Sequence, residues 1–245
     1  MMRTVGVLGG MGPAATLDFM DKALKAGAGA SEQDNVRLIV DCNPGVLDRN
    51  AALAGEGPSP GPALAAMARG LEAAGADFLV MACNAAHAWQ GDIEAATVVP
   101  FVSIVEEACR WLAAHEPPGR RIGLMAAGAC MESGLYQNAL AAAGLEALTL
   151  TPAVLAAFME ALYRFKAGDL GPAPRAAMRS CARALIDSGA QVILAACTEV
   201  PLLLDGQELA VPFVDATRIL ALRTVAYARG EPLPARPALA RADGV

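Results

Sequence analysis

The sequence predicts an α/β fold made of two similar three-layer α/β/α lobes, each with a parallel sheet. Three observations support this. Short apolar runs alternate along the chain with longer amphipathic segments. The runs are continuously apolar, as in parallel strands that helices cover on both faces. The whole pattern also occurs twice, which favours two layered lobes over one.

Three segments of the first half recur in the second half in the same order. Residues 75–84 (GADFLVMACN) align without gaps with residues 189–198 (GAQVILAACT), at an offset of 114 residues. Residues 99–102 recur at 211–214 and residues 5–8 recur at 122–125, at offsets of 112 and 117. Collinear matches at a nearly constant offset indicate an internal duplication.

The apolar runs predict strands and the amphipathic segments predict helices, in alternation. In the first half these are strand 4–9, helix 14–27, strand 36–41, helix 61–75, strand 77–82, a short helix from residue 84, strand 99–103 and helix 104–114. In the second half they are strand 121–126, helix 132–143, strand 146–150, helix 152–166, helix 173–188, strand 190–196, strand 211–214 and helix 216–229. Two segments rich in Gly and Pro, 55–62 and 168–174, are predicted to interrupt this pattern as lids or plain connections.

The length of 245 residues allows one large domain or two small ones. Residues 115–119 (HEPPG) separate the two halves of the pattern. We therefore expect a first lobe of residues 1–114 completed by residues 215–245 with the C-terminal helix, and a second lobe of residues 115–214.

Composition argues against several classes of partner and location. The chain carries 25 acidic and 19 basic side chains, and its net charge of −6 would repel nucleic-acid backbones. No uncharged apolar run approaches the roughly 20 residues that span a bilayer. Residues 9–13 (GGMGP) would break the apolar segment of a signal peptide. We expect a cytoplasmic protein with neither nucleic-acid nor membrane partners.

The cysteines and histidines predict free thiols and no metal site. Six cysteines occur without a CxxC pair, which favours reduced thiols over a disulfide framework. The two histidines do not form a metal-ligand spacing with the cysteines. The glycines of residues 9–12 satisfy neither the dinucleotide nor the phosphate-loop motif, so we expect no nucleotide cofactor.

Cys83 and Cys197 occupy equivalent positions in the duplication. Each directly follows a predicted buried strand and precedes a polar residue, Asn84 or Thr198, at the start of a predicted helix. Ligands of open parallel sheets bind beyond the carboxyl ends of the strands. A helix N-terminus lowers the pKa of a thiol and attracts a carboxylate. This placement suits reactive thiols.

Two equivalent thiols on opposite sides of one cleft suit racemisation at a Cα atom. One group must remove a proton from one face while the other returns a proton to the opposite face, and the roles exchange with the hand of the substrate. A single buried cysteine more often serves packing. We interpret Cys42, Cys109 and Cys181 in that way.

Six motifs, in order along residues 4–225, resemble those of the aspartate/glutamate racemase family. They are 9–13 (GGMGP), 43–44 (NP) with 48–49 (DR), 83–87 (CNAAH), 132–136 (ESGLY), 166–168 (KAG) and 197–201 (CTEVP). The resemblance implies a cofactor-independent amino-acid racemase with its active site between two α/β lobes. It also implies that the matched cysteines act as acid and base, and that the protein forms a homodimer.

The resemblance also implies roles for the residues around the cysteines. Arg49 and Lys166 match the basic residues that hold the distal carboxylate of aspartate, and two cations would compensate the second charge of a dicarboxylic amino acid. Asn84 and Thr198 suit the α-carboxylate and the charge that builds on it. The remaining substrate-binding residues expected from the motifs are Met11, Ala85, Cys130 and Glu199.

Two motif residues have more than one interpretation. His87 lies four residues after Cys83 and could approach the thiol or cap and pack. Glu199 could orient the substrate amine or Thr198, or simply favour a helix N-terminus.

The chain departs from the family pattern at two places. Position 85 is Ala where the family has Thr, and residues 127–130 read AGAC where the family has a Thr-rich loop. We expect interconversion of L- and D-aspartate. The missing hydroxyls leave two alternatives open: a racemase of glutamate or another amino acid, and a non-catalytic amino-acid-binding protein of the same fold.

Overall fold

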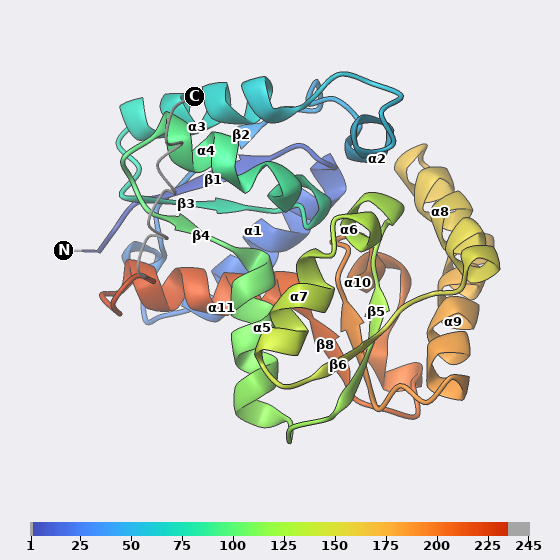
Figure 1. Ribbon diagram of the computed structural model, residues 1–245. Coiled ribbons are helices and arrows are strands. Elements are labelled where there is room, and N and C mark those ends of the chain that lie inside the picture. Colours follow the sequence, from blue (N-terminus) through green and yellow to red (C-terminus); the bar gives the residue numbers. More distant parts are fainter. Residues whose placement is uncertain (1, 235–245) are drawn as a thin grey trace.

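The computed structural model describes residues 2–234 (Figure 1). The first half contains β1 (Val5–Gly9), α1 (Pro13–Gly27), β2 (Leu38–Cys42), α2 (Arg49–Leu53), α3 (Gly61–Ala73), β3 (Phe78–Met81), α4 (Gln90–Ala96), β4 (Phe101–Val102) and α5 (Ile104–His115). The second half contains β5 (Arg121–Met125), α6 (Gly128–Glu132), α7 (Leu135–Ala142), β6 (Glu146–Leu148), α8 (Pro152–Lys166), α9 (Pro172–Asp187), β7 (Val192–Ala195), α10 (Val200–Leu203), β8 (Phe213–Asp215) and α11 (Ala216–Ala228). Short 3-10 turns are η1 (Glu32–Asp34), η2 (Ala85–Trp89) and η3 (Gly206–Glu208).

The strands form two parallel four-stranded sheets of identical topology, β2-β1-β3-β4 and β6-β5-β7-β8. The register repeats as well. Leu79 pairs with Phe101 in the first sheet, and Ile193 pairs with Phe213 in the second. The predicted fold class, two similar α/β lobes with parallel sheets, is confirmed.

Equivalent glycines make equivalent close contacts in the two halves. A Cβ atom on Gly6 would lie 2.9 Å from the Cβ of Ala76, and one on Gly123 would lie 2.8 Å from the Cβ of Ala190. Only glycine therefore lets the turn before the third strand of each sheet close onto the first strand. The duplication extends from the sequence into the packing.

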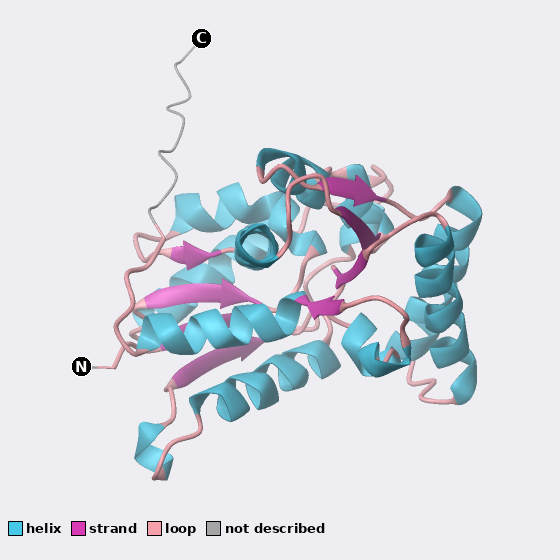
Figure 2. Ribbon diagram, turned by 90° about the horizontal axis from the view of Figure 1, so that it is seen from below, coloured by secondary structure: helices cyan, strands magenta, loops and turns pink. Residues whose placement is uncertain are grey.

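The helices cover both faces of each sheet, as Figures 1 and 2 show. Helices α3 and α4 lie on the outer face of the first sheet, and α8 and α9 on the outer face of the second. Between the sheets, α1, α5, α7 and α11 share one continuous apolar core. Alternate strand residues enter different cores: Val80 and Leu194 face the shared one, whereas Leu79 and Ile193 face the outer ones. Both faces are buried, which explains the continuous apolar runs.

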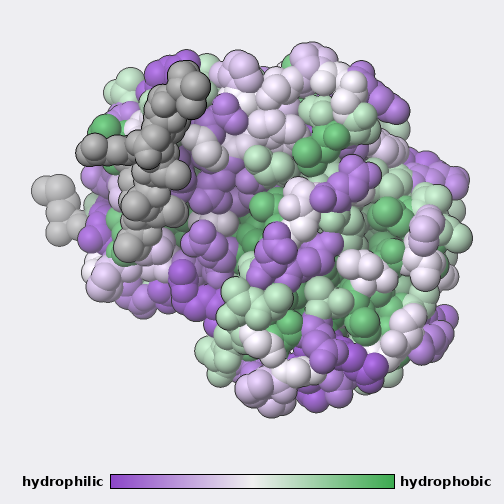
Figure 3. Space-filling model, in the orientation of Figure 1, coloured by the Kyte–Doolittle hydropathy of each residue, from purple (hydrophilic) through white to green (hydrophobic). Residues whose placement is uncertain are grey.

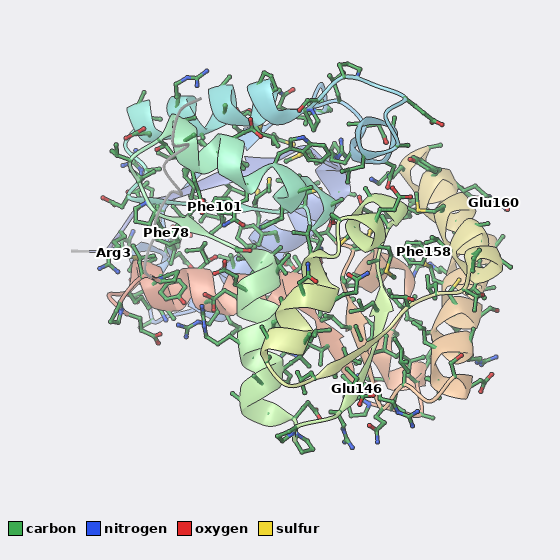
Figure 4. The ribbon with its side chains drawn as sticks, viewed as in Figure 1. Arg3, Phe78, Phe101, Glu146, Phe158 and Glu160 are labelled. Carbon is green, nitrogen blue, oxygen red and sulfur yellow. The ribbon has the colours of Figure 1, made fainter. Side chains whose placement is uncertain are left out.

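Helix α8 shows how the amphipathic pattern directs the outer helices. Phe158 is fully buried and points toward the second sheet, whereas Glu160 is exposed and points away (Figure 4). On the face seen in Figure 3, hydrophobic residues are interspersed with hydrophilic ones. None of the helices in residues 2–234 combines the length and apolar character needed to cross a membrane.

Helix α11 follows the last strand of the second sheet but packs against α1 and α5 of the first half. Arg3 ties this arrangement down by donating a hydrogen bond of 2.6 Å to the Tyr227 carbonyl. The division into residues 1–114 with 215–245 and residues 115–214 stays a prediction. Residues 1 and 235–245 of that division lie outside the described residues.

Several elements differ from the sequence prediction. The predicted helix 132–143 begins at Leu135 as α7, because Gly134 adopts a φ of 66°, and the short helix α6 before it was not predicted. Helix α3 begins at Gly61 as predicted, with Pro62 in its first turn, where proline is tolerated, but it ends at Ala73, two residues before the predicted end. The short helices α2 and α10 were not predicted, because four or five residues show no periodicity.

Candidate active site

The loops that follow the central strands of the two sheets meet at one place. In each sheet the strand order reverses beside the first strand, so a crevice opens at the carboxyl ends of β1 and β3, and likewise of β5 and β7. Such switch points are where open α/β sheets bind ligands. Here both contribute to one cavity.

Every substrate-binding and catalytic residue expected from the sequence lines this cavity. These residues are Met11, Arg49, Cys83, Asn84, Ala85, Cys130, Lys166, Cys197, Thr198 and Glu199. The structure thus brings all of them together, while their roles stay predictions. The cavity has a volume of about 20 Å³, room for about one water molecule.

The two thiols come from opposite halves of the chain. Cys83 follows β3 and is 5% exposed, and Cys197 follows β7 and is 7% exposed. Each is buried, and each lines the shared cavity. This placement satisfies the first requirement of a two-sided proton transfer, which is one acid/base group from each side.

A buried polar network surrounds Cys197. The Cys197 thiol donates to Glu199 Oε2 at 3.2 Å, and the Thr198 hydroxyl donates to the same oxygen at 3.1 Å. The other carboxylate oxygen, Oε1, lies 3.3 Å from Lys166 Nζ but accepts no well-directed hydrogen bond from a described residue. Burial, together with the Glu199 charge, raises the pKa of Cys197 well above its ordinary value. Cys197 is accordingly a neutral thiol in this state.

Lys166 stays charged beside this network. Burial opposes the charge, but Glu199, Cys197 and Cys83 together outweigh burial and raise the pKa of Lys166 above its ordinary value. Its side chain is 27% exposed, at the end of α8. Lys166 thus closes the cavity on the side of the second half.

Arg49 is a buried cation whose bonds go to backbone carbonyls. Its Nη1 donates to the carbonyls of Val46 (3.1 Å) and Leu47 (2.8 Å), and its Nη2 donates to the carbonyl of Met11 (3.3 Å). Among residues 2–234, no carboxylate pairs with this guanidinium and Nε has no acceptor. Buried charges are normally paired. The cavity therefore contains a place for an anion.

Asn84 presents unused donors. Its Oδ1 accepts a hydrogen bond of 2.5 Å from the Tyr136 hydroxyl, whereas its Nδ2 is buried without a partner among the described residues. Asn84 is 2% exposed and lines the cavity. A buried amide nitrogen of this kind can donate hydrogen bonds to an acceptor on a bound ligand.

His87 packs beneath Cys83. Its Nδ1 lies 2.8 Å from the Cys83 carbonyl oxygen, and the Ile104 N–H donates to its Nε2 at 3.2 Å. The ring is therefore neutral, with its proton on Nδ1. Burial lowers the pKa of His87 to about 4. Because both ring nitrogens bind the backbone, the structure supports the packing and capping interpretation of this residue.

Cys130 lines the cavity from α6. Burial raises the pKa of its thiol to about 12, with the nearby thiols of Cys83 and Cys109 adding to the effect. Cys130 is thus a neutral, weak donor. No group of three or more His, Cys, Asp or Glu side chains within residues 2–234 is arranged to hold a metal ion.

Sequence reasoning missed four residues that also line the cavity: Asn50, Ala127, Leu162 and Ala196. Two had a usable signal, because Asn50 follows Arg49 directly and Leu162 precedes Lys166 by one helical turn. Asn50 is the more informative. It accepts from the Ala129 N–H at 2.9 Å and donates to the Tyr163 hydroxyl at 3.1 Å.

These two bonds of Asn50 form a clasp between the halves, since Asn50 is on α2 and its partners are on α6 and α8. Figure 1 shows α2 beside the start of α6 and the end of α8. An outer cleft of about 450 Å³ lies next to the cavity. The two spaces share Met11, Arg49, Lys166 and Glu199 as walls.

The chain is similar to known proteins over most of its length. The sequence model of the family described as Asp/Glu/hydantoin racemase matches residues 8–224. The chain is 25% identical over 228 residues to the broad specificity amino-acid racemase RacX of Bacillus subtilis, an alignment that covers 90% of this chain and 96% of that protein.

Solved structures show the same fold. An aspartate racemase of Picrophilus torridus superposes with a TM-score of 0.79 at 25% identity, covering 93% of this chain and 94% of that chain. A putative Asp/Glu racemase of Yersinia pestis gives 0.77 at 25% identity, covering 93% and 100%. Glutamate racemase isoform RacE1 of Bacillus anthracis gives 0.63 at 18% identity, covering 93% and 83%, and this likeness shows the fold alone.

The family match spans nearly the whole chain and includes every residue that lines the cavity. The chain therefore belongs to the Asp/Glu/hydantoin racemase family, and it is an amino-acid racemase, which is an isomerase.

Proposed function

We propose that this amino-acid racemase interconverts L- and D-aspartate, with Cys83 and Cys197 as the two acid/base groups. The observation that carries the proposal is the cavity itself. It places equivalent thiols from the two halves around one space that also contains a buried guanidinium without a carboxylate partner.

The proton transfer is symmetric in the proposed mechanism. With one enantiomer, the Cys83 thiolate removes the Cα proton, and the Cys197 thiol gives its proton to the opposite face. The product leaves with inverted configuration, and the two thiols have exchanged protonation states. The other enantiomer follows the same path in reverse. Cys197, neutral at rest because of burial and Glu199, starts as the donor.

The distal carboxylate of aspartate would neutralise the cation that the protein leaves unpaired. Arg49 is anchored by three carbonyl bonds and keeps Nε free, so it offers a rigid donor rather than a mobile one. Lys166 already faces Glu199 and adds a second positive charge. A dicarboxylic substrate therefore fits the charge of the cavity.

The α-amino and α-carboxylate groups would bind at opposite walls. The free Nδ2 donors of Asn84 suit the α-carboxylate, where negative charge grows as the Cα proton leaves. The single Thr198 hydroxyl proton is already donated to Glu199. Thr198 therefore has no free proton for the α-carboxylate, the role expected from the sequence, and we instead assign the ammonium group of the substrate to the oxygens of Glu199 and Thr198, which accept.

A second candidate function rests on one observation. Ala85 and Ala127 line the cavity without hydroxyl groups, and Leu162 adds an apolar surface beside them. A less polar wall can accommodate a longer side chain, which favours racemisation of glutamate or another amino acid. The relative RacX, named for broad specificity, supports keeping this alternative.

The experiment is proton NMR of L-aspartate and L-glutamate in deuterated water with the purified protein, followed by chiral chromatography. We expect the Cα–H signal of aspartate to disappear as D-aspartate forms. Cys83→Ser and Cys197→Ser should each abolish racemisation. Cys181→Ser is the matched control, because Cys181 is buried in the outer core of the second half and lines neither cavity.

The outcomes separate the candidates. Exchange of glutamate but not aspartate would replace the first candidate by the second. Racemisation that survives either cavity substitution would refute the two-thiol mechanism.

We also propose the homodimer and the cytoplasmic location that were expected from the sequence. Light scattering of the purified protein and fractionation of expressing cells test them, and a monomer or an exported protein would refute them.

A further inference from the structure

Tyr136 joins the two halves at the cavity. It is fully buried on α7 of the second half, and its hydroxyl donates to Oδ1 of Asn84, which follows β3 of the first half. At 2.5 Å between the two oxygens, this hydrogen bond lies at the short end of the usual O–H···O range. Tyr136 itself lines neither the cavity nor the outer cleft.

The phenol keeps its proton and donates it to Asn84. Burial raises the pKa of Tyr136 well above its ordinary value, so the hydroxyl keeps its proton. Asn84 Oδ1 is the acceptor of this proton among the described residues. A rotated amide would turn its N–H groups toward the phenol and leave the buried proton without an acceptor.

The bond therefore decides which end of the Asn84 amide faces the cavity. With Oδ1 held by Tyr136, the Nδ2 group is the end left without a partner. With the opposite orientation, a carbonyl-like oxygen would face an incoming carboxylate and repel it.

We propose that Tyr136 is a positioning residue that holds the Asn84 amide with its N–H donors toward the α-carboxylate of the substrate. This inference rests on the proposed function, in which Asn84 binds that carboxylate. A fixed donor stabilises the developing charge without reorganising during the reaction. Without the phenol proton, the Asn84 amide can rotate, and for part of the time its Oδ1 rather than its Nδ2 faces the substrate carboxylate.

The test is a double-mutant cycle of Tyr136→Phe and Asn84→Ala, read in kcat for aspartate and in aspartate affinity by calorimetry. Removing an oxyanion donor typically lowers kcat by about 10²-fold, and we expect roughly that for Asn84→Ala. Tyr136→Phe should lower kcat by about 10-fold in the wild type and leave it unchanged in the Asn84→Ala background, because the two act through one contact.

Tyr227→Phe is the matched control. Tyr227 is 2% exposed, belongs to the same shared core, and its hydroxyl donates to Glu107 at 2.7 Å, away from the cavity. Both Tyr→Phe variants remove a buried hydroxyl, so both should lose a similar amount of stability in urea. Only Tyr136→Phe should change kcat and aspartate affinity.

If Tyr136→Phe lowers kcat equally in the wild type and in the Asn84→Ala background, the inference is overturned. It is also overturned if Tyr136→Phe alone changes neither kcat nor aspartate affinity. The proposed function fails separately. A wild type that binds aspartate without exchanging its Cα–H refutes the racemisation proposal, while the affinities still decide the role of Tyr136. A wild type that does neither overturns both.

Discussion

His87 makes the stability of the protein depend on pH in a way that one substitution can isolate. The unperturbed imidazole has a pKa of 6.5, and burial lowers the pKa of His87 to about 4 in the folded chain. Between pH 6.5 and pH 4 the imidazole is protonated in the unfolded chain but stays neutral in the folded chain. The stability contribution is therefore present above pH 6.5 and is lost as the pH falls toward 4.

The size of the effect follows from the two pKa values. Each pKa unit corresponds to about 1.4 kcal/mol, so the whole drop is worth about 3 kcal/mol. At pH 5 the unfolded imidazole is almost fully protonated and the buried one is not, which gives a loss of about 2 kcal/mol relative to pH 7.

The perturbation is His87→Asn, which removes the titration. The Asn Nδ2 can keep the hydrogen bond to the Cys83 carbonyl that His87 Nδ1 makes. At pH 7 the variant should be less stable, because the Ile104 N–H loses its acceptor and the ring leaves a void. That deficit should shrink by about 2 kcal/mol between pH 7 and pH 5.

The assay is urea unfolding of both proteins at pH 7, 6 and 5. Asp18 and Glu106, whose pKa values burial raises, also titrate in the acid range, but they do so in both proteins and cancel in the difference. A stability difference that stays constant from pH 7 to pH 5 would refute the reasoning, since it would mean that the folded protein accepts the proton on His87.

Three further predictions concern the sheet, the clasp and the anion site. Gly123→Ala should lower the free energy of unfolding in urea by about 1–3 kcal/mol, because the new Cβ would lie 2.8 Å from the Cβ of Ala190. Gly70→Ala, in open space on α3, should be neutral or stabilising by up to about 1 kcal/mol, and equal effects of the two substitutions would contradict the close-packing account. Asn50→Ala should open the cavity and speed alkylation of its thiols by iodoacetamide, while the unfolding midpoint changes little, and an unchanged alkylation rate would mean that Asn50 does not limit access. Arg49→Met should lower aspartate affinity by about 10- to 100-fold, the effect of losing a hydrogen bond to a charged group, without an equal loss in the free energy of unfolding of the free protein. An unchanged affinity in calorimetry would show that Arg49 does not bind the substrate.

The main features of the fold could be predicted because they depend on local pattern. Continuous apolar runs identified the strands, and the alignment of residues 75–84 with 189–198 identified two equivalent sheets. The composition of the cavity could also be predicted, since parallel strands bring the residues after their carboxyl ends to one edge. This rule places Cys83 and Cys197 each at the edge of its own sheet, whereas a site between the two lobes was expected from the family resemblance.

The connections between the halves could not be predicted. The bond between Tyr136 and Asn84 joins residues 52 positions apart, and nothing in the local sequence around either residue indicates the pairing. Asn50 was missed because α2 is too short for a periodic signal. The interruption at Gly134 was missed because a single glycine does not by itself show that its φ will be positive.

The packing of α11 on α1 and α5 has a consequence for how the protein is made. The first half leaves the ribosome first, yet the faces of α1 and α5 that contact α11 stay uncovered until residues 216–228 have been synthesised. Contacts between such distant segments form late and slowly. The half that is made first is therefore completed last. A chain that stops before Ala216 would leave the faces of α1 and α5 that contact α11 open to aggregation, even though every residue of the two sheets is present.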